Sequence, residues 1–277
     1  MLGRPVVKQM VEAGFDVTAL MRDMDKIINA FPSQLKLLQG DLKNTEQIDQ
    51  LLHGQDAVYI SLSVPQNEKI NDWHSETDGM KIILESAKRQ SIQRIILLSS
   101  LVQRYQGKNN FNWWVFELKD RSVEMVKESG ISFTIFYPST FMESFLGKYK
   151  QGKRILMAGK SEYPMYYIAG DDFGKQVVHS LRLSSSQNKE YVIQGPEPLR
   201  PEEAANIFVN NYKKEKLSIS TAPFGLLKFL AIFSAKIEYG VHIIEALNKY
   251  PEKFESENTW RELGKPETTL KEFAEAR

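Results

Sequence analysis

The chain has 277 residues, of which 42% are hydrophobic and 26% are charged, which is typical of one large globular domain or one domain with a smaller appendage. Its net charge of +1 provides no global field for nucleic acid or an anionic membrane, and the lack of cysteine excludes disulfides and cysteine-ligated metals. We therefore expect a cytoplasmic protein with a small-molecule substrate, without nucleic-acid or membrane partners.

Residues 1–146 alternate helix and strand patterns. After a first helix that begins at Gly3 and ends at Gly14, the strands are expected at 17–21, 35–39, 57–61, 94–98 and 132–137. Helices are expected between them at 23–30, 45–52, 75–89 and 117–129. Apolar strands joined by helical crossovers predict a doubly wound parallel sheet, the Rossmann-type α/β fold, which binds its ligand at the carboxyl ends of the strands.

Residues 147–277 follow a less regular pattern. Strand-like pieces at 163–169 and 191–194 mix with expected helices at 171–183, 200–212 and 224–247. This pattern predicts a smaller α+β region, partly interleaved with the sheet, that binds the substrate. The apolar and aromatic residues of 224–239 fit a buried helix, a lid or a homodimer face, so both a monomer and a homodimer remain open.

The first helix begins where the glycine-rich turn of a nucleotide-binding βαβ unit would end. Gly3 stands in the place of the last glycine of a G-x-x-G-x-x-G turn, whose helix N-terminus binds pyrophosphate. We therefore expect an N-terminally shortened form that lacks a central strand and most of the loop. Buried strand groups left without partners cost about 1–3 kcal/mol each, which opposes folding, so such a form is expected to bind its dinucleotide weakly or not at all.

Eight short motifs follow one another in a consistent order. They are Met1-Leu2-Gly3, Arg22-Asp23, Gly40-Asp41-Leu42, Leu98-Ser99-Ser100, Glu117-Leu118-Lys119 with Glu124, and the segments 129–138, 167–174 and 191–197. Together they resemble the NmrA-like, atypical branch of the extended short-chain dehydrogenase/reductase superfamily. The resemblance implies a Rossmann domain that binds NAD(P) and a C-terminal substrate-binding region.

The charge after the second expected strand bears on the choice of cofactor. Arg22 follows Leu20-Met21, nineteen residues after Gly3. A guanidinium can bind the 2′-phosphate of NADP, whereas NAD-binding folds place a carboxylate there for the ribose hydroxyls. NADP is therefore expected, with NAD less favoured. Asp23 could instead act as a helix cap, or as a ribose acceptor if the register differs by one residue.

Further cofactor-binding residues come from the ends of the other strands. Asp41 suits an acceptor for the adenine amino group, a role that the resemblance also implies, although it could equally cap the following helix. The backbone at Ser61 and Leu62 would pass close to the cofactor. The resemblance adds Leu42, Ser99, Tyr137, Pro138 and Ser139, of which Pro138 and Ser139 would line the nicotinamide end.

The catalytic residues depart from the family pattern. Reductases of the superfamily use a tyrosine as proton donor, a lysine one helical turn later that lowers the phenol pKa, and a serine that orients the carbonyl. Lys119 and Ser99 or Ser100 match by position, but Val115 replaces the tyrosine. Lys119 can still bind the nicotinamide ribose, and Tyr105 is a hypothetical substitute acid.

The remaining patterns leave three functional alternatives open. The four histidines lack ligand spacing, so no metal site is expected. The first alternative is an NADP-dependent oxidoreductase that acts on a small apolar carbonyl or quinone-like substrate. The second is a non-catalytic NADP-binding sensor or interaction protein, and the third is an inactive fragment.

Overall fold

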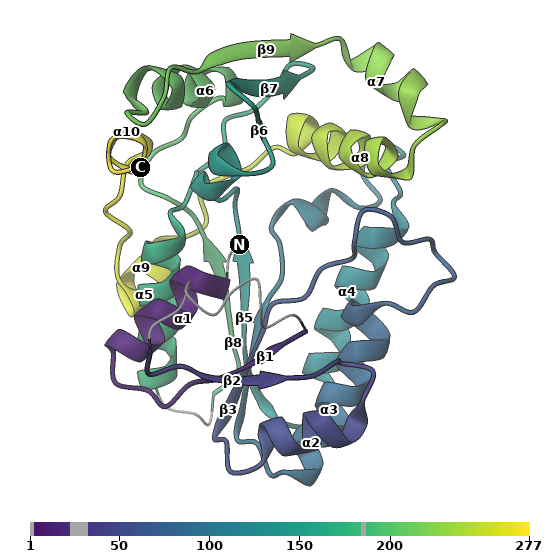
Figure 1. Ribbon diagram of the computed structural model, residues 1–277, viewed down its shortest axis with the longest axis vertical. Coiled ribbons are helices and arrows are strands. Elements are labelled where there is room, and N and C mark those ends of the chain that lie inside the picture. The colour runs from purple at the N-terminus through teal and green to yellow at the C-terminus, as the bar shows by residue number, and fades with distance from the viewer. Residues whose placement is uncertain (1–2, 23–32, 184–186) are drawn as a thin grey trace.

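The computed structural model describes residues 3–22, 33–183 and 187–277 (Figure 1). The expected helix at 23–30 and residue Asp23 lie outside these described residues. The chain begins with α1 (Gly3–Glu12), which ends before Gly14. Gly14 has φ +87°, the left-handed conformation in which glycine commonly terminates a helix.

The strands of the Rossmann part form two parallel sheets. The first consists of β1 (Thr18–Met21) and β2 (Lys36–Gln39). The second has the order β3 (Ala57–Ile60), β4 (Arg94–Leu98), β5 (Ser132–Pro138), β8 (Lys189–Ile193). The doubly wound α/β prediction is thus confirmed, although in the described residues no strand joins β1 to β3, where the central strand of the fold was expected.

Both faces of the four-stranded sheet are covered, as the continuous apolar strand β4 predicted. Ile95 and Leu97 belong to one buried cluster, and Ile96 and Leu98 belong to another, because successive side chains of a strand point to opposite faces. The first cluster includes residues of α2 (Thr45–Leu52), α3 (Met80–Arg89) and α4 (Trp114–Lys127). The second includes residues of α1, α5 (Gly170–Arg182) and α9 (Glu257–Leu263).

Close packing of α1 on α5 depends on a glycine. A Cβ added at Gly174 would lie 2.7 Å from Cγ of Gln9 and 3.0 Å from the carbonyl oxygen of Pro5. The small residue therefore lets the two helices approach closely and places the start of α1 against the sheet.

The C-terminal part has its own apolar cluster. Its elements are η4 (Met142–Leu146), β6 (Lys150–Gln151), β7 (Arg154–Ala158), α6 (Pro201–Asn211), β9 (Ser218–Ala222) and α10 (Leu270–Glu275). Phe145 and Phe208 stack at 5.0 Å between ring centroids at the centre of this cluster. The later segment β8 pairs with β5, so the chain returns to the Rossmann sheet after residue 147.

Two expected elements differ from the structure. The predicted helix at 224–247 is two helices, α7 (Phe224–Ala231) and α8 (Ala235–Lys249), because the Ser234 side chain accepts a hydrogen bond from the Ile237 amide and starts a new helix. The predicted strand at 163–169 makes only single bridges, Met165 with Leu199 and Ile168 with Phe141. In the part of the chain that the structure describes, no helix is long and apolar enough to cross a bilayer.

Candidate functional site

Most of the predicted site residues lie just beyond the carboxyl ends of the parallel strands. Because parallel strands end at the same edge of a sheet, this placement brings the loops after β3, β4 and β5 together. These loops carry Ser61 and Leu62, Ser99 and Ser100, and Ser139, and β5 itself ends with Tyr137 and Pro138. Arg22 is exposed directly after β1, and Gly3 is the first residue of α1.

Lys119, in the second turn of α4, forms a buried ion pair. Its ammonium Nζ lies 2.5 Å from Oε1 of Glu76, and the two side chains are 16% and 3% exposed. The other carboxylate oxygen, Oε2, is buried without a hydrogen-bond partner among the described residues. The pair thus combines a cation with a free acceptor. This arrangement fits two neighbouring hydroxyls of a ribose, one of which accepts from Lys119 while the other donates to Glu76.

Glu76 is held by an unusual helix. It lies in η2 (Ser75–Gly79), a single π-helical turn that leads into α3. Such turns are frequent at functional sites because they redirect a side chain. His74 precedes the turn; its backbone amide donates to Asp78, and its ring lies 5.1 Å from the Trp114 ring.

The His74 ring donates from both nitrogens. Nδ1 lies 2.9 Å from a carboxylate oxygen of Glu68 and Nε2 lies 3.2 Å from the carbonyl oxygen of Ile70, and both partners are acceptors. Burial alone would lower the pKa of His74, but the hydrogen bond and charge of Glu68, the Ile70 carbonyl and the charge of Asp78 raise it overall. These partners therefore stabilise the imidazolium form of His74 beside the π-helical turn.

We expect the free energy of unfolding to fall as the pH rises above about 6.5. Because the folded-state pKa of His74 is raised, its contribution is present below the unfolded-state pKa and is lost as the pH rises through the folded-state pKa. Urea unfolding at about pH 6 and about pH 9 measures this loss, which His74→Gln should reduce. His53→Gln, at an exposed histidine, is the control; an equal pH dependence in wild type and His74→Gln would contradict the prediction.

Aromatic rings pack together at the start of α4. Trp113, which precedes α4, packs edge-on against Tyr239 of α8 at 4.9 Å and stacks on His242 at 5.2 Å. Burial and, secondarily, the charge of Glu76 raise the pKa of Tyr239 to about 12. Helix α8 thus brings C-terminal side chains to the start of α4.

The predicted serines are placed differently from each other. The Ser99 hydroxyl is buried and donates to Gln103 at 2.6 Å, and Gln103 donates in turn to Asp120 at 2.6 Å. Burial raises the pKa of Asp120, and the hydrogen bond from Gln103 opposes that shift. The hydrogen bonds from Ser99 through Gln103 to Asp120 therefore attach the loop after β4 to α4. Ser100 is half-buried at the end of β4.

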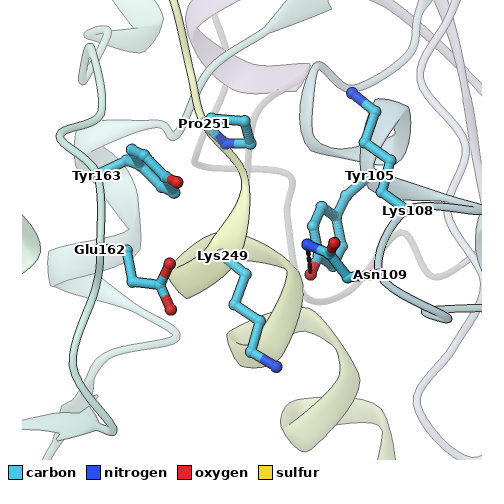
Figure 2. Close-up of a pocket in the computed structure, with 7 residues that line it drawn as sticks. All are labelled: Tyr105, Lys108, Asn109, Glu162, Tyr163, Lys249 and Pro251. Carbon is cyan, nitrogen blue, oxygen red and sulfur yellow. Dashed lines mark hydrogen bonds between the residues drawn. The ribbon is translucent and has the colours of Figure 1, made fainter.

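Tyr105 lies at a separate cavity of about 500 Å³. It ends η3 (Val102–Tyr105), and its hydroxyl accepts from the Asn109 side chain at 3.3 Å. Figure 2 shows that Tyr105 and Asn109 face two groups of residues across the cavity. Glu162 and Tyr163 follow β7, and Lys249 and Pro251 lie at the end of α8 and just after it. The full lining is Tyr105, Lys108, Asn109, Glu162, Tyr163, Lys249 and Pro251. The cavity is thus lined by residues of both the Rossmann part and the C-terminal region.

The structure does not show Tyr105 in contact with Lys119. Lys119 is paired with Glu76, while the Tyr105 ring packs on Phe111 at 5.1 Å. Val115, which occupies the position of the family's tyrosine, is 2% exposed and belongs to the largest apolar cluster. The expected substitution of Tyr105 for that acid remains a prediction.

Asp41, predicted to bind the adenine amino group, lies at a pocket at the start of α2. Asp41 accepts from the Lys43 amide at 3.0 Å, and Asn44, not Asp41, is the N-cap of α2, accepting from the Gln47 amide. The alternative role of Asp41 as the helix cap is thus wrong. Leu42 and Trp73 both lie close to Gly79. Asp41 remains available at a pocket of about 520 Å³.

Two other predicted residues, Tyr137 and Ser139, have hydrogen-bond partners of their own, whereas Gly3 has open space around it. The Tyr137 hydroxyl donates to Glu190 at 2.7 Å, and burial raises the Tyr137 pKa. The Ser139 hydroxyl donates to Glu252 at 2.8 Å, which ties the end of β5 to the C-terminal region. A Cβ added at Gly3 would meet nothing within 4 Å, so packing alone does not demand glycine there.

Sequence reasoning missed Glu76 and Tyr239. Glu76 lies forty-three residues before Lys119, in a polar stretch with no catalytic motif, and Tyr239 comes from the far end of the chain. Only the packing of η2 and α8 against α4 brings them to the lysine. Across the described residues, no group of three His, Asp or Glu side chains could hold a metal ion.

Known proteins share this architecture. The chain is 24% identical over 251 residues to the Photosystem II assembly factor Ycf39 of Guillardia theta, which covers 89% of this chain and 78% of the relative. Triphenylmethane reductase from Citrobacter sp. complexed with NADP(H) superposes with a TM-score of 0.72 at 15% identity, over 99% of this chain and 95% of that one. Quinone oxidoreductase QOR2 from Escherichia coli complexed with NADPH gives 0.71 at 14% identity, over 100% and 96%.

The parallel sheets, their covering helices and the residues at the strand ends define a Rossmann-type protein. Residues 1–182 match the family described as NAD(P)H-binding, and the chain belongs to that family. The expected cofactor class, a nicotinamide dinucleotide, is confirmed by this membership.

Proposed function

We propose that this protein is an NADP-dependent oxidoreductase of the NmrA-like, atypical short-chain reductase type that reduces a small apolar carbonyl or quinone-like substrate. The observation that carries the proposal is the Lys119 ammonium, fixed by a buried carboxylate among aromatic rings at the start of α4. Relatives and structural neighbours with reductase names support the class of reaction.

The residues of the chain have separate roles in this mechanism. NADPH supplies a hydride when bound. Lys119 and Glu76 would hold the nicotinamide ribose, and the packed rings of Trp113 and Tyr239 would exclude water beside the substrate. The proton reaches the reduced oxygen from water, from the substrate itself or from Tyr105, whose hydroxyl lies at the cavity beside α8.

Turnover is tested by following NADPH consumption with a series of quinones and aldehydes. We expect consumption with apolar quinones, and loss of that activity in the charge-free double variant Lys119→Met/Glu76→Gln. Thermal unfolding of the double variant shows whether it is folded. Equal turnover in the double variant and wild type would contradict the assignment of the site.

Replacing Arg22 by alanine is expected to weaken NADPH binding roughly 10- to 100-fold, the effect of losing a charge-assisted hydrogen bond. NADH lacks the 2′-phosphate, so its affinity should change little. Titration followed by nicotinamide fluorescence measures both. Arg121→Ala, at an exposed arginine of α4, is the control. If Arg22→Ala lowers both affinities equally, Arg22 does not select NADP.

A second function is favoured by one observation. Val115 is buried where the family's proton donor stands, so a non-catalytic NADP-binding sensor or interaction protein is the alternative. The two functions separate in the same assays. NADPH binding that depends on Arg22, without consumption of NADPH by any acceptor, would favour the second.

A further inference from the structure

Helix α7 exposes an apolar surface. Five large side chains, Leu226, Phe229, Leu230, Ile232 and Phe233, are 38–75% exposed, and no residue of the helix is buried. The rings of Phe229 and Phe233 contact each other at 5.7 Å, so the side chains form one patch, which we call the α7 patch. A contiguous exposed apolar patch rimmed by polar residues marks a protein or membrane contact.

Basic residues occur both beside the α7 patch and at the opposite end of β9 (Ser218–Ala222), which runs toward α7. The segment 213–237, which contains β9 and α7, carries five lysines, Lys213, Lys214, Lys216, Lys228 and Lys236, all exposed, and a single acidic residue, Glu215. Glu215 is already paired with Lys150 at 2.6 Å, so it does not offset the lysines. The overall charge of +1 therefore conceals a local positive excess.

The pairing of β7 with β9 adds more positive charge to the same edge. Arg154 is opposite Ser218, and the Ser218 amide donates to the carbonyl oxygen of Lys153 at 3.0 Å. Lys153 and Arg154 are exposed and lie close in the fold to the lysines at 213–216. Figure 1 shows β7, β9 and α7 along one edge of the molecule, away from the Rossmann sheet.

The charge distinguishes the possible occupants of the α7 patch. In a symmetric pair of identical chains each patch would face its own copy, and like charges around both patches would repel each other. An anionic bilayer instead attracts lysines near its surface while an apolar helix inserts between the headgroups. At eight residues, α7 can lie in the interface but is too short to cross a bilayer.

We propose that the α7 patch docks this protein on the surface of an anionic phospholipid bilayer. Phe229, Ile232 and Phe233 enter the boundary between headgroups and acyl chains, and the lysines at 213–216 with Lys153 and Arg154 contact the phosphates. Lys228 has a different role, because it pairs with Glu245 at 3.0 Å and lies over the Phe224 ring, which fixes α7 on α8. The docked face is separate from the Lys119 site, so docking does not depend on the proposed reaction.

Flotation with vesicles tests this proposal. The full chain is mixed with vesicles of phosphatidylcholine alone or of equal parts phosphatidylcholine and phosphatidylglycerol, and the bound fraction is measured. We expect binding to the mixed vesicles only, weakened by salt. Phe229→Ser/Phe233→Ser should lower the binding constant at least about tenfold, and Lys213→Gln/Lys214→Gln should lower it about fivefold for each lysine.

Ile70→Ser is the matched control, because Ile70 is 60% exposed in a loop outside α7. It should leave vesicle binding unchanged, and circular dichroism should show all variants folded. Equal binding to neutral and anionic vesicles would overturn the proposal. No vesicle binding by wild type would also overturn it, and a dimer in light scattering that Phe229→Ser/Phe233→Ser abolishes would then assign the α7 patch to a second copy of the chain.

Discussion

Replacing Lys119 by methionine is expected to lower the free energy of unfolding by about 3–5 kcal/mol. The substitution leaves the Glu76 carboxylate, whose side chain is 3% exposed, without its cation, and a buried unpaired charge is among the most destabilising changes in a protein. Urea unfolding at neutral pH measures the loss. The second substitution in Lys119→Met/Glu76→Gln removes that charge and should recover most of the stability.

Helix α4 offers a matched control for this experiment. Lys127 pairs with Glu190 at 2.8 Å, but the two side chains are 39% and 43% exposed. Lys127→Met should cost no more than about 1 kcal/mol, because solvent screens an exposed pair. If Lys119→Met lowers the free energy of unfolding no more than Lys127→Met does, the prediction that the buried ion pair stabilises the protein more than the exposed pair is wrong.

Replacing Gly195 by alanine is expected to destabilise the protein by more than about 3 kcal/mol or to prevent folding. The added Cβ would lie 1.7 Å from the carbonyl oxygen of Tyr167 and 2.6 Å from its carbonyl carbon. Both atoms belong to backbone, which cannot move aside as the end of a side chain can. The same region is held by a hydrogen bond from the Gly195 amide to Tyr166 at 3.1 Å. Thermal and urea unfolding measure the effect.

Gly225→Ala is the control for this substitution. Gly225 lies in α7, and a Cβ added there would meet nothing within 4 Å. Alanine in a helix interior should therefore leave stability unchanged or raise it by up to about 1 kcal/mol. Similar stabilities for the two alanine variants would show that the chain relaxes around Gly195.

The sequence predicted the elements whose signal is local. The near-continuous apolar run at 94–98, which only Arg94 interrupts, predicted β4 to the residue, because a strand covered on both faces is mostly apolar. The prediction of one helix at 224–247 was wrong, because the apolar spacing continues across Ser234 and gives no sign that the helix ends. In the structure, the Ser234 side chain accepts a hydrogen bond from the Ile237 amide and begins a second helix. The same apolar spacing suggested burial, whereas α7 is exposed.

The candidate site was predictable only in part. Lys119 and the strand-end residues follow from motifs and from the rule that parallel strands end at one edge. Glu76 and Tyr239 could not be found, because a π-helical turn and a helix from the other end of the chain place them there. Net charge likewise gave no hint of the basic edge at 213–216, since acidic residues elsewhere balance it.

The separate β1–β2 sheet has a consequence for dynamics and for cofactor selection. In the described residues, β1 and β2 are hydrogen-bonded only to each other. Leu38 of β2 is 41% exposed, and Leu20 of β1 is only partly buried where it contacts the largest cluster. Such a ribbon should open at a lower free energy than β4 and exchange its amide hydrogens sooner. Arg22 lies at the end of this ribbon, so NADPH that binds Arg22 must also order it, and its affinity is reduced by that cost. Selectivity for the phosphate would then appear as cofactor-dependent protection of β1 and β2 from hydrogen exchange.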